Sequence, residues 1–241
     1  MRGQADYGAL AAKETTAAVS DMGEVAARLG SIVTYDKRGD VVDFDSCEDA
    51  VLRWAVYPGT VNDYARLDST SVKSGSQAIR LHSDNVSGAG VTITRGIPVL
   101  ASKRLGFEVS FSRLSTGVNL QLLIYYFTGV KYYLAALKLD NFIRKLYVWN
   151  IAGGWTEVAD SGYLFEMNFL FSTVKLVADF EALLYQRLLF NPYEHDISSI
   201  PLYSFLNTAA PHIMMHISLN NLDAAGGDVW IEDIVWTQAE P

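Results

Sequence analysis

Aromatic side chains that alternate with polar ones along the chain have the type and spacing best suited to ligand binding. Tyr125 and Tyr132 fall on the polar side of their segments, beside Gln121 and Lys138. Sugar rings stack on aromatic faces, and nearby polar groups can bond their hydroxyls. The candidate sugar-binding residues are Tyr125, Tyr132, Trp149 and Trp155. Packing in a second layer, an assembly interface or the filling of a sheet edge would use the same residue types.

Catalysis by a nucleophile or by acid and base groups finds little support. The sequence has no G-x-S-x-G motif and no glycine motif that cradles a phosphate. Its histidines are His82, His195, His212 and His216. The polar run Glu194-His195-Asp196 follows Pro192, which is typical of a loop. We therefore expect a protein that is not an enzyme.

Charge and cysteine content exclude several classes of protein. The 241 residues carry a formal net charge of −8, whereas a nucleic-acid partner needs a basic face. The single cysteine, Cys47, excludes an intrachain disulfide and a cysteine-based zinc site. The first residues lack the apolar core of a signal peptide, and the apolar region 118–139 is too interrupted for a membrane helix. We expect folding in a cytoplasm, without membrane contact.

From residue 41 onwards, apolar residues recur with a period of two, which predicts β-strands. In 104–112, for example, Leu105 and Phe107 share one face while Glu108 lies on the other. Thr128-Gly129 and the run 152–154 predict hairpin turns, and a third hairpin is expected near Glu181. About eleven to thirteen strands without a long helix predict an all-β antiparallel sandwich.

Several predicted strands are apolar on both faces. Leu123 and Phe127 oppose Leu122 and Ile124, while Leu183, Tyr185 and Leu189 oppose Leu184 and Leu188. A two-layer sandwich needs only one apolar face per sheet. The second face is therefore expected to be covered by the N-terminal segment, by long loops or by another subunit.

Three segments carry a family resemblance. They are FDSCEDAVLRW at 44–54, VKSGSQAIRLHS at 72–83 and VWIEDIVWT at 229–237. In order and spacing the set resembles the jelly-roll sandwiches of carbohydrate-binding modules and of concanavalin-like or laminin-G-like lectins, over roughly residues 41–238. The resemblance implies one jelly-roll β-sandwich domain over residues 40–241.

The same resemblance implies a structural calcium ion that joins the first and last strands. The matching positions are Glu48 and Asp233, with Asp45 as a further ligand and main-chain carbonyls near Ser74 and Gly75 completing the shell. Asp233 is also predicted to share a core-facing register with Val229, Ile231 and Val235. The alternative is that these acids are turn residues or solvated. Neither acidic group, 43–49 or 232–233, matches the E-x-D-x-E pattern of concanavalin-type glycosidases.

Residues 1–39 differ from the rest of the chain. They are rich in alanine, and the spacing of Asp21 and Glu24 predicts a capping box for a short helix that would stop at Gly30. In style this arm resembles the start of a bacteriophage structural protein.

The function expected first is therefore that of a non-enzymatic virion protein, a capsid decoration or tail component. Its arm would join it to copies of itself and to other virion proteins. The alternative is a carbohydrate-binding module with a structural calcium that attaches to glycans.

Overall fold

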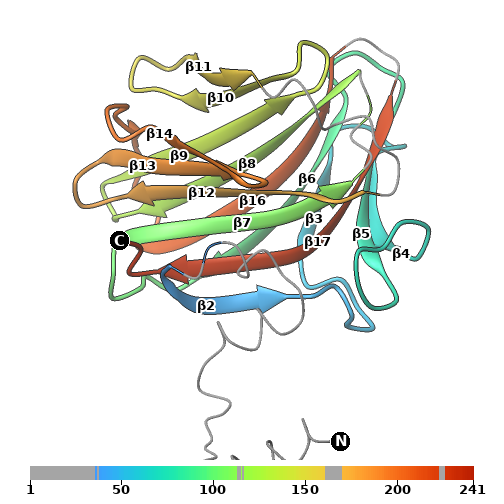
Figure 1. Ribbon diagram of the computed structural model, residues 1–241, viewed down its shortest axis with the longest axis horizontal. Coiled ribbons are helices and arrows are strands. Elements are labelled where there is room, and N and C mark those ends of the chain that lie inside the picture. The colour runs from blue at the N-terminus through green and yellow to red at the C-terminus, as the bar shows by residue number, and fades with distance from the viewer. Residues whose placement is uncertain (1–35, 37, 113–114, 116, 161–169, 223–225) are drawn as a thin grey trace, which may run out of the picture.

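The computed structural model describes residues 36, 38–112, 115, 117–160, 170–222 and 226–241. All regular secondary structure in these ranges is β-strand (Figure 1). Most of the expected arm, including its short helix, lies outside the described residues. Within them, no helix is long and apolar enough to cross a membrane.

The strands form two sheets of eight, which we call sheet I and sheet II. Sheet I contains β3 (Ala55–Pro58), β6 (Gly90–Ile97), β16 (His212–Asn221), β8 (Val118–Phe127), β9 (Lys131–Asp140), β10 (Lys145–Trp149), β11 (Trp155–Asp160) and β15 (Tyr203–Leu206). Sheet II contains β4 (Tyr64–Asp68), β5 (Ala78–Ser83), β17 (Gly227–Gln238), β7 (Arg104–Ser112), β12 (Ser172–Asp179), β13 (Leu184–Phe190), β14 (Tyr193–Asp196) and β2 (Asp40–Asp45).

All strand pairs are antiparallel, which confirms the expected sandwich. The three expected hairpins are β8–β9, β10–β11 and β12–β13. The strands outnumber the expected eleven to thirteen because β3, β4, β14 and β15 are only four or five residues long. Such short segments show too little periodicity to be recognised in the sequence.

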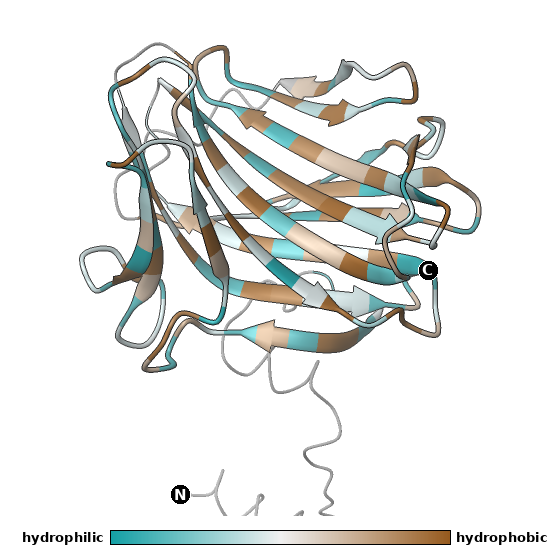
Figure 2. Cartoon of the chain, turned by 180° about the vertical axis from the view of Figure 1, so that it is seen from behind, coloured by the Kyte–Doolittle hydropathy of each residue, from teal (hydrophilic) through white to brown (hydrophobic). Residues whose placement is uncertain are grey.

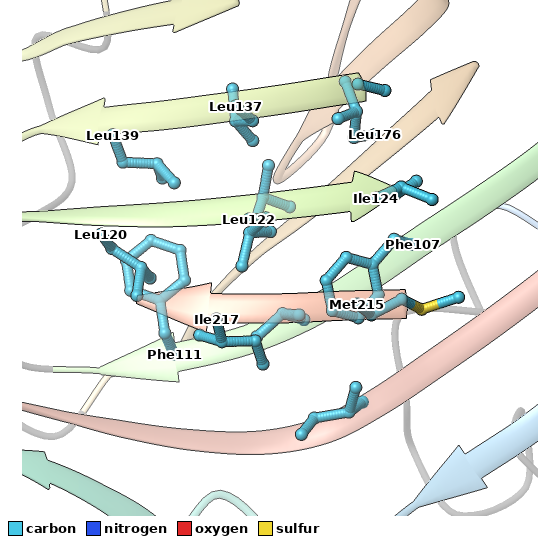
Figure 3. Packing of buried hydrophobic residues seen from close by; sticks show 14 of the residues in the cluster. Phe107, Phe111, Leu120, Leu122, Ile124, Leu137, Leu139, Leu176, Met215 and Ile217 are labelled. Atoms are coloured by element: carbon cyan, nitrogen blue, oxygen red, sulfur yellow. The ribbon is translucent and has the colours of Figure 1, made fainter. Parts of the chain in front are cut away.

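The core lies between the two sheets and follows the predicted alternation. Sheet II contributes Phe107, Phe111 and Leu176, and sheet I contributes Leu122 and Ile217, none more than 1% exposed (Figure 3). Alternate residues of the same strands point away from the core, so each sheet also has an outer face.

Two β-bulges overturn parts of the predicted register. In β17 the register shifts between Glu232 and Val235, and Asp233 has a φ of 50°. Val229 and Ile231 face the core, but Val235 pairs with Glu108 and lies on the outer face. The prediction that Asp233 shares a register with all three apolar residues was therefore wrong, because a bulge inserts a residue into the alternation.

The second bulge lies in the β12–β13 pair, between Val177 and Ala178. Tyr185 was expected to oppose Leu188, but both side chains are buried in the core. The Tyr185 hydroxyl donates to the Trp149 carbonyl at 2.8 Å and accepts from the Ala136 N–H at 2.9 Å. Tyr185 thus forms hydrogen bonds from sheet II to the main chain of sheet I across the core.

The outer face of sheet II is covered over β7, β12 and β17, where Glu108, Lys175 and Val235 are fully buried. The ammonium of Lys175 contacts the carboxylates of Asp36, at 3.1 Å, and Glu240, at 2.7 Å. The two carboxylates come from opposite ends of the described chain. The expectation that a second apolar face is covered thus applies to this sheet, although charged groups form much of the cover.

Candidate functional site

The four predicted sugar-binding residues share the outer face of sheet I. Figure 2 shows the molecule with sheet I toward the viewer. They come from four consecutive strands, β8 to β11, and each is partly exposed. We call this surface the aromatic face. Its ring-bearing residues are Tyr125, Phe127, Tyr132, Tyr147, Trp149, Trp155, Tyr203, Phe205, His212 and His216.

The first aromatic group surrounds Tyr125 and Tyr132. Their ring centroids are 5.4 Å apart, and the rings are inclined at 67°. Phe205, on the short strand β15, pairs with Tyr132 in register and is 58% exposed. Sequence reasoning missed β15, although the alternation of Tyr203 with Phe205 was a weak signal of a strand.

The second group contains Trp149, Trp155 and Tyr203. Trp149 pairs with Trp155 at the end of the β10–β11 hairpin, with centroids 5.0 Å apart and rings inclined at 79°. The turn fixes this arrangement, because the Asn150 side-chain oxygen accepts from the N–H groups of Ala152, at 2.9 Å, and Gly154, at 3.3 Å. The Tyr185 hydroxyl holds the Trp149 main chain from inside the core.

Burial sets the protonation of the titratable rings. It raises the pKa of Tyr125 and of Tyr132, so both phenols keep their protons at neutral pH. It lowers the pKa of His216 to about 4, so this imidazole is uncharged at neutral pH. Among the buried polar atoms described on this face, Trp149 Nε1 and His216 Nε2 have no hydrogen-bond partner.

Polar side chains lie beside the rings. Gln121 donates to the Asn119 side-chain oxygen at 2.8 Å, and Thr92 and Ser218 share a hydroxyl hydrogen bond of 2.8 Å. The Lys138 ammonium lies 4.3 Å from the Tyr147 ring centroid. Amides, hydroxyls and a cation are thus available next to aromatic surfaces.

The three predicted calcium ligands have other partners. Asp45 accepts hydrogen bonds from the Cys47 N–H and the Trp54 indole, both at 2.9 Å. Glu48 accepts from the Ser76 N–H at 2.9 Å and from its hydroxyl at 2.6 Å. Asp233 is 2.8 Å from the ammonium of Lys73. The described residues contain no group of three side chains that could hold a metal ion.

The loop near Ser74 explains this arrangement. It was expected to direct carbonyl oxygens at an ion, but it directs N–H groups at carboxylates. Glu232 accepts from the main-chain N–H groups of Lys73, at 2.6 Å, and Ser74, at 2.7 Å. In this structure the carboxylates that were predicted to bind calcium thus have hydrogen-bond donors or an ammonium as their partners.

No protein-family model matches the sequence, and a search of curated proteins finds no match. Solved structures do match in fold. A sialidase aligns with a TM-score of 0.54 and 11% identity over 84% of this chain, which spans only 19% of that protein. An endo-β-1,4-glucuronan lyase from Trichoderma reesei aligns with a TM-score of 0.54 and 9% identity. The alignment covers 83% of this chain and 96% of the lyase chain.

A Bacillus subtilis protein of unknown function with a galectin-like fold aligns with a TM-score of 0.53 and 11% identity, covering 84% and 98% of the two chains. The chain thus has a concanavalin-like or galectin-like jelly-roll β-sandwich fold, as the three sequence patterns predicted. These likenesses give no support to the expected bacteriophage-like arm.

Proposed function

We propose that the chain is a non-enzymatic carbohydrate-binding domain that holds glycans on the aromatic face. One observation carries the proposal: rings from β8, β9, β10, β11 and β15 gather on an outer sheet face and stay partly exposed. An outer face that meets only water needs no such rings. Aromatic surface beside amides and hydroxyls is suited to the two sides of a sugar, its C–H face and its hydroxyl edge.

Two further observations support the proposal. Trp149 Nε1 and His216 Nε2 are buried without a hydrogen-bond partner among the described residues, and a buried polar group without a partner calls for an explanation. The sialidase and the glucuronan lyase that share the fold are both named for carbohydrates. Because a fold hosts many functions, the aromatic face carries the argument and the likeness only agrees with it.

We propose a domain without catalytic activity because of the carboxylates on the aromatic face. Asp140 and Glu157 lie on the aromatic face, and each forms an ion pair with a lysine, at 3.4 Å from Lys138 and 2.7 Å from Lys145. Hydrolysis of a glycoside generally needs one carboxyl group that stays protonated beside one that is ionised. We propose no such arrangement, because each of these two carboxylates already has a lysine as its partner.

Titration calorimetry with a panel of oligosaccharides tests the proposal. For the glycan that binds, we expect Trp155→Ala and Tyr132→Ala each to weaken affinity by roughly tenfold or more, as loss of a stacked aromatic anchor does. Tyr193→Ala is the matched control, because Tyr193 is 61% exposed on sheet II. Equal losses in control and test variants, or no binding by the folded protein, would refute the proposal.

A further inference from the structure

We propose that the aromatic face binds single, soluble chains of neutral sugars rather than acidic glycans or flat crystalline polysaccharide. This inference rests on the proposed function and names its ligand class. It follows from two features of the face, the pairing of its charges and the inclination of its rings.

The first feature is that Lys138 and Lys145, the lysines of the aromatic face, already form ion pairs with carboxylates. The Lys138 ammonium is 3.4 Å from Asp140 and also lies over the rings of Tyr147 and Trp155, at 4.3 and 5.2 Å. Lys145 is 2.7 Å from Glu157. A uronate carboxylate would have to displace an existing anion or lie beside it, and like charges brought together cost free energy.

His216 does not change this balance. Its ring centroid is 4.8 Å from that of Tyr125, and its strand partners are Leu123 on β8 and Thr94 on β6. The imidazole is uncharged at neutral pH. The polar groups beside the rings that stay partly exposed are uncharged ones, the amide of Gln121 and the hydroxyl of Thr92. These suit the hydroxyl groups of neutral sugars.

The second feature is the inclination of the rings. Tyr125 and Tyr132 meet at 67°, Trp149 and Trp155 at 79°, and Trp149 and Tyr203 at 80°. A flat crystal surface could stack only on rings that lie in one plane. Inclined rings present successive faces in different directions, which a single twisted chain can follow. The strands from β8 to β11 extend about 14 Å across the sheet, enough for several sugar rings.

The experiment compares three ligand classes with the full chain. Soluble neutral oligosaccharides of glucose, xylose, mannose and galactose are titrated beside oligoglucuronates and oligogalacturonates, each at low and moderate ionic strength. Microcrystalline cellulose and chitin are tested by sedimentation. We expect a neutral oligosaccharide to bind at least tenfold more tightly than any uronate, with little dependence on salt, and no retention on the crystals.

Asp140→Asn gives an internal check, because it removes the partner of Lys138 while keeping the shape of the side chain. We expect it to raise affinity for uronates severalfold at low salt and to leave neutral binding within twofold. Salt-sensitive binding of uronates by the wild type, lost in Trp155→Ala, would overturn this inference and keep the proposed function. Retention of the wild type on cellulose or chitin crystals, lost in Trp155→Ala, would also overturn this inference and keep the proposed function. No binding of any class by the folded chain would overturn both.

Discussion

Glu108 lies on the outer face of sheet II with both carboxylate oxygens buried and without a hydrogen-bond partner. Burial raises its pKa to about 8, although Lys175 and Lys73 nearby act in the opposite direction. Asp36 and Asp233 add to the increase. The carboxyl group therefore keeps its proton in the folded state at neutral pH.

The stability of the protein should depend on this proton. In the unfolded chain Glu108 ionises near its ordinary pKa of 4.5, whereas the folded protein holds the proton up to about 8. The free energy of unfolding therefore contains a contribution that is complete below pH 4.5 and is lost as the pH rises to 8. Glu108→Gln should remove this dependence and stabilise the protein at pH 8 by roughly 2–4 kcal/mol.

Denaturant unfolding at a series of pH values measures the effect. Glu157→Gln is the control, because it makes the same substitution at an exposed position on the other sheet. A Glu108→Gln variant with the wild-type slope would contradict the assignment of the proton to this residue.

Lys73 supplies the positive charge beside Asp233, whose side chain is 1% exposed. Lys73→Met leaves that carboxylate without its ion-pair partner, so we expect a loss of about 2–3 kcal/mol in thermal unfolding. Lys103→Met, at an exposed position, should cost far less. A fall in the wild-type melting temperature on adding a calcium chelator would show instead that an ion shares Asp233 with Lys73.

At the scale of the strands, the β7–β17 pair depends on a glycine. A Cβ on Gly106 would lie 2.9 Å from Lys175 Cε and 2.7 Å from Glu240 Oε1, and closer still to the Thr237 hydroxyl. The C-terminal residues therefore pack directly onto the backbone of β7. A Cβ on Gly96 in β6 would have its nearest neighbour, the Ile213 carbonyl oxygen, at 3.8 Å.

Gly106→Ala should therefore destabilise the protein by about 1–3 kcal/mol, because Thr237 and Glu240 must move away from β7. Gly96→Ala is the matched control and should change stability by less than about 0.5 kcal/mol. Chemical unfolding of both variants measures the difference. Equal effects would mean that the C-terminal residues adjust without cost.

Period-two alternation predicted the long strands correctly because each has one face in the core, as in 104–112 and 212–221. It also placed Tyr125 and Tyr132 outside that core. It failed at Asp233 and Tyr185, since a bulge inserts a residue that no local pattern marks. Phe205 and His216 could not be assigned to the aromatic face because their neighbours there are distant in sequence.

At the scale of the whole molecule, the charged cluster on sheet II joins segments far apart in sequence. Asp36 is 2% exposed and contacts Lys175 at 3.1 Å and Arg187 at 3.4 Å, while Arg187 also pairs with Glu240. Arg38 contacts Glu194 at 2.8 Å. The boundary expected at residue 39 would therefore divide a buried network.

Two truncations separate the roles of these residues. Removal of residues 1–39 should lower the melting temperature well below that of a chain lacking only 1–35, because it leaves Lys175 and Arg187 without Asp36. Equal melting temperatures would contradict a structural role for Asp36. Light scattering of the full chain and the 1–35 deletion also tests assembly. A defined oligomer that becomes a monomer would favour the virion protein expected first.

Lys175 and Arg187 hold both Asp36 and the last residues of the chain on sheet II, on the side of the sandwich opposite the aromatic face. A label, a solid support or a second protein joined at the C-terminus is thereby directed away from the rings. The domain can be tethered by that end with its proposed binding surface turned outward. Immobilisation at the C-terminus is accordingly the geometry to choose when glycans are passed over the protein.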